Sequence, residues 1–394
     1  MFFSESQAIV MKRIRLILLL LMLTALIWWP QGCRPGEPDP PSISPSPVFR
    51  DPARWNTFCG NFNRTGTTTA TGPKEGRLEW KLHLNRAVRS SPVVDSQGRV
   101  FIGSDDGGIY CISPGGEILW RFATGDKVFS TPAVSENRIY VGSDDGHLYC
   151  LNYAGEVIWK YRADGFIGSS PAVDSGGMIY FGSGDGHIYC LDGDGKLVWR
   201  YKTGDWVWSS PALTGDGGIV IGSDDGYIYR LSNSGELLWK VKTGYSVMST
   251  PAVSPQGIIY CGSDDGKLYA LKPSGEILWK FDGGYQAGSS PAVTAVGTIL
   301  FGTEGGKFLA VDPNGVMQWA FSAGYDVFSS PAVDGEGKIY FGSASRYLYC
   351  IDRQGTLLWR YRTNDVILSS PCIAPDGSLY FASTDEHLYK ISQD

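Results

Sequence analysis

A segment of 39 or 40 residues occurs eight times in this chain, and no other feature restricts its fold as strongly. Each copy contains Ser-(Ser or Thr)-Pro, an apolar run, Gly-Ser in most copies, a second apolar run and a Trp. The repeated prolines are Pro92, Pro132, Pro171, Pro211, Pro251, Pro291, Pro331 and Pro371, and the tryptophans in step with them are Trp80, Trp120, Trp159, Trp199, Trp239, Trp279, Trp319 and Trp359. A repeat of this length is typical of architectures in which each copy packs only against its neighbours.

Residues 330–361 illustrate one copy. Ile, Val, Tyr, Phe and Trp fill four short segments, and across the copies the breaks between such segments are Asp-Gly, Gly-rich or Asn-Gly turns of the kind that antiparallel hairpins require. After residue 77, no segment is long enough for an amphipathic helix. The sequence therefore predicts an all-β fold, an eight-bladed β-propeller of four-stranded antiparallel blades.

The two ends of the repeat array are each incomplete. Residues 371–394 supply three strands without a Trp strand, whereas residues 77–82 form a Trp strand with no repeat before it. We expect this N-terminal strand to complete the last blade, which removes the open edges of the array. The predicted propeller comprises residues 77–394 and is monomeric.

The N-terminal residues 1–33 have the pattern of an export signal. Lys12, Arg13 and Arg15 precede an apolar run from Leu16 to Trp29, which is shorter than the roughly 20 residues of a membrane-spanning helix. The run ends in Pro30-Gln31-Gly32-Cys33, which resembles a bacterial lipoprotein processing site with Cys33 as the candidate lipidation residue. Simple secretion and an uncleaved N-terminal anchor are the alternatives.

Residues 34–54 are rich in proline and read as an extended linker between a membrane and a folded domain. The sequence thus predicts an exported protein of the cell envelope, held at a membrane surface through its N-terminus.

Charge and histidine content argue against two partner classes. The chain has 34 Lys and Arg, 40 Asp and Glu and a net charge of -6, and the basic residues do not cluster, so we expect no nucleic acid partner. Its four histidines are few and scattered, and we expect no metal site. Asp-Asp-Gly segments occur in four of the eight copies, each at the same hairpin position, which favours turn chemistry over calcium binding.

The cysteines favour burial over disulfide bonding. Four of the eight occupy one equivalent repeat position, namely Cys111, Cys150, Cys190 and Cys350. Equivalent positions in successive sheets lie about 10 Å apart, beyond the reach of a disulfide. Cys261 and Cys372 also replace apolar residues of the repeat, and Cys59 is the one cysteine after the export signal that has no equivalent in it.

The positions that vary between copies predict the functional site. Ser stands two residues before each proline and Val, Ile or Ala four before it, whereas the residues three and five before it vary widely. Alternation along an extended segment places this variable pair together, at the mouth of the propeller axis. The candidate partner-binding or ligand-binding residues are Arg89, Phe129, Phe166, Trp206, Trp208, Met248 and Phe328, with Lys127, Asp326 and Leu368 among them. Aromatic residues, Met and Arg are enriched at protein interfaces.

The repeated words Ser-Pro-Ala-Val, Ile-Tyr-Phe-Gly-Ser, Leu-Tyr-Cys and Gly-x-x-x-Trp resemble the pyrroloquinoline-quinone-type propeller repeat across residues 77–394. Residues 55–76 resemble the lead-in segment of such propellers. This family includes quinone- and calcium-dependent dehydrogenases and non-catalytic envelope propellers of the outer-membrane protein assembly machinery. The resemblance implies, for the dehydrogenases, a quinone pocket on the axis, a calcium site, adjacent cysteines and long insertions between strands.

Neither adjacent cysteines nor long insertions occur in this chain. We therefore expect a non-catalytic scaffold without a cofactor, which mediates protein–protein interaction in the bacterial envelope, as in outer-membrane protein assembly. The alternatives are a quinone- and calcium-dependent dehydrogenase-like protein and a carbohydrate or small-molecule binding propeller.

Overall fold

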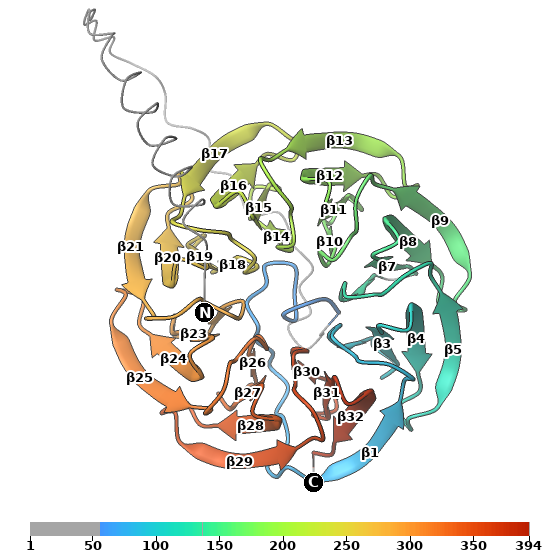
Figure 1. The fold of residues 1–394 in the computed structure, drawn as a ribbon, viewed down its shortest axis with the longest axis vertical. Helices are drawn as coiled ribbons and strands as arrows, with labels where there is room; N and C mark the ends of the chain where they lie inside the picture. The colour runs from blue at the N-terminus through green and yellow to red at the C-terminus, as the bar shows by residue number, and fades with distance from the viewer. Residues whose placement is uncertain (1–55, 136, 394) are drawn as a thin grey trace, which may run out of the picture. The chain divides into compact units, whose positions relative to one another are not determined.

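The structure is a computed structural model that describes residues 56–135 and 137–393. In these residues the chain forms strands and turns without any helix, and eight four-stranded antiparallel sheets surround a central axis as blades (Figure 1). The predicted all-β, eight-bladed propeller is confirmed. The export signal, the Pro-rich linker and Cys33 lie outside the described residues.

Each blade has four strands, counted outward from the axis. The innermost strands are β2 (Val93–Val94), β6 (Ala133–Val134), β10 (Ala172–Val173), β14 (Ala212–Leu213), β18 (Ala252–Val253), β22 (Ala292–Val293), β26 (Ala332–Val333) and β30 (Cys372–Ile373). The second strands are β3 (Val100–Gly103), β7 (Ile139–Gly142), β11 (Ile179–Gly182), β15 (Ile219–Ser223), β19 (Ile259–Gly262), β23 (Ile299–Gly302), β27 (Ile339–Gly342) and β31 (Leu379–Ser383). The third strands are β4 (Gly108–Ile112), β8 (His147–Leu151), β12 (His187–Leu191), β16 (Tyr227–Leu231), β20 (Lys267–Leu271), β24 (Lys307–Val311), β28 (Tyr347–Ile351) and β32 (His387–Ile391). The outermost strands are β5 (Ile118–Ala123), β9 (Val157–Arg162), β13 (Leu197–Lys202), β17 (Leu237–Lys242), β21 (Ile277–Asp282), β25 (Met317–Ser322), β29 (Leu357–Arg362) and β1 (Leu78–His83).

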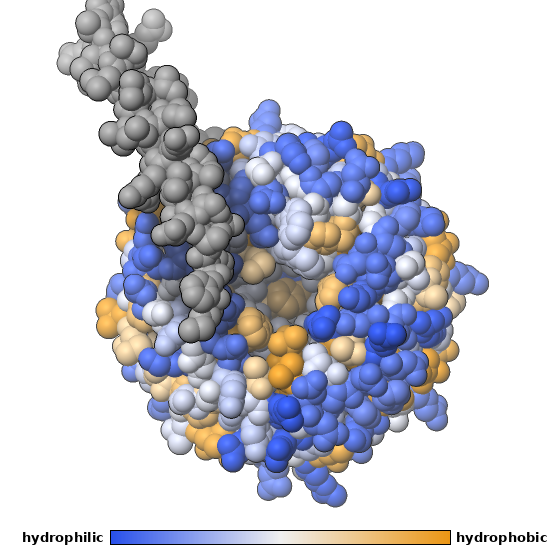
Figure 2. Space-filling model, viewed as in Figure 1, coloured by the Kyte–Doolittle hydropathy of each residue, from blue (hydrophilic) through white to orange (hydrophobic). Residues whose placement is uncertain are grey.

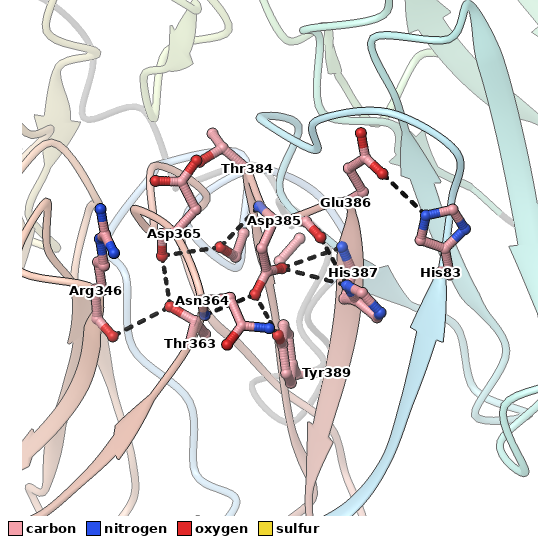
Figure 3. A network of polar contacts seen from close by, with 12 residues as sticks. His83, Arg346, Thr363, Asn364, Asp365, Thr384, Asp385, Glu386, His387 and Tyr389 are labelled. Carbon is pink, nitrogen blue, oxygen red and sulfur yellow. Dashed lines mark hydrogen bonds and ion pairs between the residues drawn. The ribbon is translucent and has the colours of Figure 1, made fainter.

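The N-terminal strand closes the ring. β1 pairs antiparallel with β32, so that the last blade runs β1-β32-β31-β30, and His83 lies opposite His387. Glu386 bonds to His83 across this seam at 2.9 Å, and Tyr389 donates to the nearby Asp385 carboxylate (Figure 3). The closure predicted from the incomplete repeats is confirmed.

Hydrogen bonds around the axis show why the Ser-(Ser or Thr)-Pro segment recurs in every copy. The backbone amide of the residue before each proline donates to the hydroxyl of the equivalent residue in the next blade, at 2.9–3.2 Å, in all eight blades. The preceding Ser accepts a hydrogen bond from the amide of the Gly or Ala that ends the apolar run of its own second strand. Because these buried groups satisfy one another, the inner wall of the propeller needs a short hydroxyl side chain at both positions.

The repeated tryptophans lie between blades, near the outer surface, and are only half-buried. Trp80, for example, packs its ring against Gly116 of the next blade and donates from Nε1 to the carbonyl oxygen of Pro114 at 3.1 Å. Gly116 has φ +88°, and a Cβ there would lie 2.9 Å from the indole. The outer strand is therefore joined to the next blade by a ring that needs a glycine partner.

The lead-in segment closes one end of the axis. Its carbonyl oxygens accept hydrogen bonds from the second residue of five innermost strands, Val134, Leu213, Val253, Val293 and Val333. Figure 1 shows this blue segment crossing the centre of the ring. Figure 2 shows that one face of the propeller is hollowed at its centre, with hydrophobic residues inside the hollow.

Arg64 fixes this segment in place. Its side chain is fully buried, and its guanidinium donates to the carbonyl oxygens of Pro211, Ser170 and Pro171, as well as to groups of the lead-in itself. Burial lowers the pKa of Arg64 to about 10, so the guanidinium stays charged at neutral pH.

The cysteines follow the prediction made from their spacing. All seven described cysteines are free and buried. Cys59, which the repeat did not place, lies in the lead-in segment, and burial raises the pKa of its thiol to about 12. In residues 56–135 and 137–393 there is no helix long and apolar enough to cross a membrane.

Candidate functional site

The residues three before each proline line a cavity of about 240 Å³ on the propeller axis. All eight contribute, and they are Arg89, Phe129, Gly168, Trp208, Met248, Gly288, Phe328 and Leu368. The ring of hydroxyl residues directly before the prolines also lines the cavity, as does Phe58 of the lead-in segment. The Val, Ile or Ala four before each proline is buried in every blade. The residues three before each proline thus face the axis, whereas those four before it are buried in the blades.

Four aromatic residues form one cluster at this mouth. The ring of Trp208 lies 4.4 Å from that of Phe166 and 6.3 Å from that of Phe129, measured between centroids, and Phe166 also meets Trp206 edge-on at 5.5 Å. Trp208 covers Gly168, where a Cβ would lie only 2.2 Å from the indole. Gly168 belongs to the copy directly before the one that carries Trp206 and Trp208. Because Gly168 has no side chain, the Trp208 ring has room to pack there.

The two residues of the variable pair form two tiers at the mouth, and only those three before each proline line the cavity. Phe166 and Trp206, five before their prolines, do not line the cavity. Trp206 lies outside it with 49% of its surface exposed, whereas Phe166 packs over Gly184, at the position where other blades carry Asp or another side chain. Met248 and Phe328 line the cavity and remain 47% and 37% exposed.

The basic residues lie on one side of the mouth. Arg89 forms an ion pair with Asp105 at 2.7 Å, and its guanidinium lies 5.3 Å from the centre of the Phe129 ring. Lys127 approaches the same ring at 6.0 Å. Arg89 is therefore already neutralised by a neighbour within the chain.

The Asp-Asp-Gly turns contribute a second set of residues that sequence reasoning missed. The second Asp performs the predicted turn chemistry, because Asp145 accepts hydrogen bonds from Tyr149 Oη and from the amide of His147. The first residue instead lies at the mouth, since its amide donates to the carbonyl oxygen of the residue five before a proline, as from Asp224 to Trp206 at 2.9 Å. Both Asp264 and Glu304, at this first position, line the axial cavity.

A signal for these residues was present in the repeat. The second turn position is Asp in six of the eight copies, whereas the first position holds Asp105, Asp144, Gly184, Asp224, Asp264, Glu304, Ala344 and Thr384. Positions that vary between copies are free to carry function, and by this criterion the first turn position is a candidate site position.

The first-position carboxylates sit in an unfavourable environment for charge. Burial raises the pKa of Asp224 to about 6, and the nearby Asp205 and Asp264 add to this shift. Burial, followed by repulsion from Asp126, raises the pKa of Asp144 to about 6 as well. In both Asp144 and Asp224 one buried carboxylate oxygen has no hydrogen-bond partner.

The cavity lining does not fit the calcium site that the dehydrogenase resemblance implies. Calcium takes six to eight oxygen ligands, drawn from clustered carboxylates and amides. Among the described residues no three His, Cys, Asp or Glu side chains are grouped to hold a metal ion, and the residues around the cavity include two carboxylates and no Asn or Gln.

Solved structures share the fold at low sequence identity. BamB from Moraxella catarrhalis is 18% identical, with a TM-score of 0.68 over 79% of this chain and 98% of that one. Quinohemoprotein alcohol dehydrogenase from Comamonas testosteroni is 14% identical, with a TM-score of 0.73 over 86% and 80%. A europium-containing methanol dehydrogenase is 13% identical, with a TM-score of 0.71 over 84% and 89%. These similarities establish the propeller and do not separate binding proteins from enzymes.

Comparison with curated proteins finds no match. The family model described as outer membrane protein assembly factor BamB matches this chain in four overlapping segments, residues 64–165, 153–228, 224–325 and 304–394. These segments cover the whole propeller. The chain therefore belongs to this family of pyrroloquinoline-quinone-like repeat propellers.

Proposed function

We propose that this protein is a non-catalytic scaffold of the bacterial cell envelope that binds a protein partner through the axial mouth, in the manner of an outer-membrane protein assembly factor. The observation that carries the proposal is the aromatic cluster of Phe129, Phe166, Trp206 and Trp208. These four residues depart from the repeat and meet at one place on the surface. Large aromatic side chains at a mouth of this kind are typical of binding hot spots.

The lead-in segment closes the end of the cavity opposite the mouth, which supports binding of a partner at the mouth. The lead-in segment bonds to five innermost strands at the other end of the axis, and Phe58 lies against the cavity from that side. A partner therefore reaches the cavity from the mouth, where Met248, Phe328 and Trp206 are exposed.

The proposal places the protein at a membrane surface through lipid attached to Cys33. In this arrangement residues 1–33 are the export signal, residues 34–54 a linker, residues 55–76 the lead-in and residues 77–394 the propeller. The family relationship supports an exported, envelope-associated protein.

The test is crosslinking in the native cell followed by mass spectrometry, with the wild-type chain and a Trp206→Ala, Trp208→Ala variant. We expect the double variant to fold and to lose the partner that the wild type captures. Trp120→Phe is the matched control, because this tryptophan belongs to the structural ring between blades. Retention of every partner by the double variant would reject the mouth as the binding surface.

A further inference from the structure

On one side of the mouth, three carboxylates form no ion pair with any cation among the described residues. Glu304 and Asp264 line the axial cavity, and Asp224 follows on the adjacent blade. Burial raises the pKa of each of these three carboxyls, and the nearest other charges acting on them are carboxylates as well. Charges of one sign that are held together in a partly buried site favour a ligand of the opposite sign.

The opposite side of the mouth behaves differently. Asp105 faces Arg89, Lys127 and Arg86, all of which lower its pKa, although burial raises it by more. The ion pair between Arg89 and Asp105 leaves little positive charge there for an anionic ligand. A cationic ligand therefore gains more electrostatic attraction at this mouth than an anionic ligand does.

Apolar walls accompany the carboxylates inside the cavity. Trp208, Met248 and Phe328 line it together with Asp264 and Glu304. The flat ring of an aromatic residue attracts a cation, and the methylene stem of an arginine or lysine packs well against such surfaces.

Gly288 lies in the cavity wall beside the carboxylate of Glu304. A Cβ at Gly288 would lie 3.2 Å from Glu304 Cγ and 3.4 Å from Phe328 Cδ1, in ordinary to tight contact with both. The equivalent space at Gly168 is already filled by the Trp208 ring. Glu304 and Phe328 therefore lie side by side around Gly288 in the cavity wall.

We propose that the axial cavity receives the positively charged side chain of an arginine or lysine from an extended segment of the protein partner. This inference rests on the proposed function, since it names the chemistry by which that partner is recognised. The charge of the incoming side chain meets Asp264 and Glu304, while its stem lies between Trp208, Met248 and Phe328. The outer aromatic residue Trp206 then covers the flanking part of the segment.

The test uses three capped pentapeptides, acetyl-Gly-Ala-X-Ala-Gly-amide, with arginine, norleucine or glutamate at X, titrated calorimetrically into the full chain. We expect the arginine peptide to bind roughly tenfold or more tightly than the norleucine peptide, because a charged hydrogen bond contributes this much. We expect the glutamate peptide not to bind. An Asp264→Asn, Glu304→Gln variant should lower the affinity for the arginine peptide to that for the norleucine peptide.

Two controls protect this test. Glu117→Gln with Glu156→Gln, at exposed turns near the outer strands, should leave binding of the arginine peptide unchanged. Added salt should weaken the arginine peptide and not the norleucine peptide in the wild-type chain, a measurement that does not depend on any variant folding. Equal affinity for the arginine and norleucine peptides, or no binding of the arginine peptide, would overturn the proposal.

The partner crosslinking separates this failure from failure of the proposed function. If Trp206→Ala with Trp208→Ala abolishes capture while Asp264→Asn with Glu304→Gln leaves it intact, the mouth binds a partner but not through a cation. If neither variant changes capture, the proposed function itself is wrong.

Discussion

The backbone amide of Ser370 donates a hydrogen bond to Oγ of Ser91 at 2.9 Å, although 279 residues separate them in the chain. This bond is the last of eight equivalent bonds around the axis, and it joins the final blade to the first. The propeller is therefore closed twice, by this ring near the axis and by β1 at the outer edge.

Replacing Ser91 tests the inner closure. Ser91→Ala removes the acceptor for the buried Ser370 amide and should lower the free energy of unfolding by about 1–3 kcal/mol. Ser91→Thr should have little effect, because Thr131 and Thr250 hold the same position in other blades. Chemical denaturation of the three proteins measures the difference. Equal losses for Ala and Thr would show that the hydroxyl acceptor is not what matters.

Deleting residues 77–84 tests the outer closure. Without β1, the edge of β32 is exposed, and an unpaired strand edge recruits other chains. We expect the deletion to form oligomers or aggregates in light scattering and to melt at lower temperature. His83→Ala, which removes the contact with Glu386 and keeps the strand, is the control and should remain monomeric. A monomeric deletion of unchanged heat stability would contradict closure by this strand.

The attachment of the lead-in segment to the propeller depends on Arg64. Arg64→Lys keeps the charge but cannot reach the acceptors on both Pro211 and Ser170, and we expect it to cost roughly 2–4 kcal/mol of stability, as other broken buried networks do. Thermal unfolding measures the loss. Lys74→Ala, an exposed change in the same segment, should have no comparable effect.

Gly168 and Gly288 form a matched pair at the cavity. A Cβ at Gly168 lies 2.2 Å from the Trp208 ring, so Gly168→Ala should displace this tryptophan, shift the tryptophan fluorescence and weaken partner capture. At Gly288 the nearest atom to a Cβ is the Val327 carbonyl oxygen at 3.1 Å, and Gly288→Ala should leave the Trp208 fluorescence unchanged. The same spectral change in both variants would show that Trp208 is not held as described.

Substitutions at the adjacent carboxyls Asp144 and Asp145 should change the stability of the protein in opposite directions at neutral pH. Asp144, whose pKa is raised to about 6, is costly to ionise in the folded protein, so Asp144→Asn should stabilise the protein above pH 6 and lose this advantage below pH 3.8. Burial alone would raise the pKa of Asp145, but hydrogen bonds from Tyr149, Gly125 and His147 lower it below its ordinary value. Asp145→Asn should therefore destabilise at neutral pH, and less so as pH falls through the pKa of Asp145 in the folded protein. Melting temperatures between pH 3 and 8 test both signs.

The sequence by itself determined the blades, their number and the way the ring closes. Each copy carries the same turns, apolar runs and Ser-Pro segment, so the local preference of any one copy agrees with that of its seven neighbours. The unpaired Trp strand at residues 77–82 matched the missing strand after Pro371, and β1 completes that blade. The alternation before each proline also placed the residues around the cavity, because an extended backbone fixes which side chains share a side.

Only the tertiary structure decided what else reaches the mouth. Asp224 and Trp206 are 18 residues apart and belong to different segments of the repeat, and a backbone hydrogen bond joins the connection before β14 to the turn between β15 and β16 and brings them together. The same packing separates Trp206 from the cavity, covers Gly168 with Trp208 and closes the far end with the lead-in segment. Local periodicity predicts which side chains of one strand share a face. The contacts at the mouth join separate segments, and their separation in space cannot be read from the repeat.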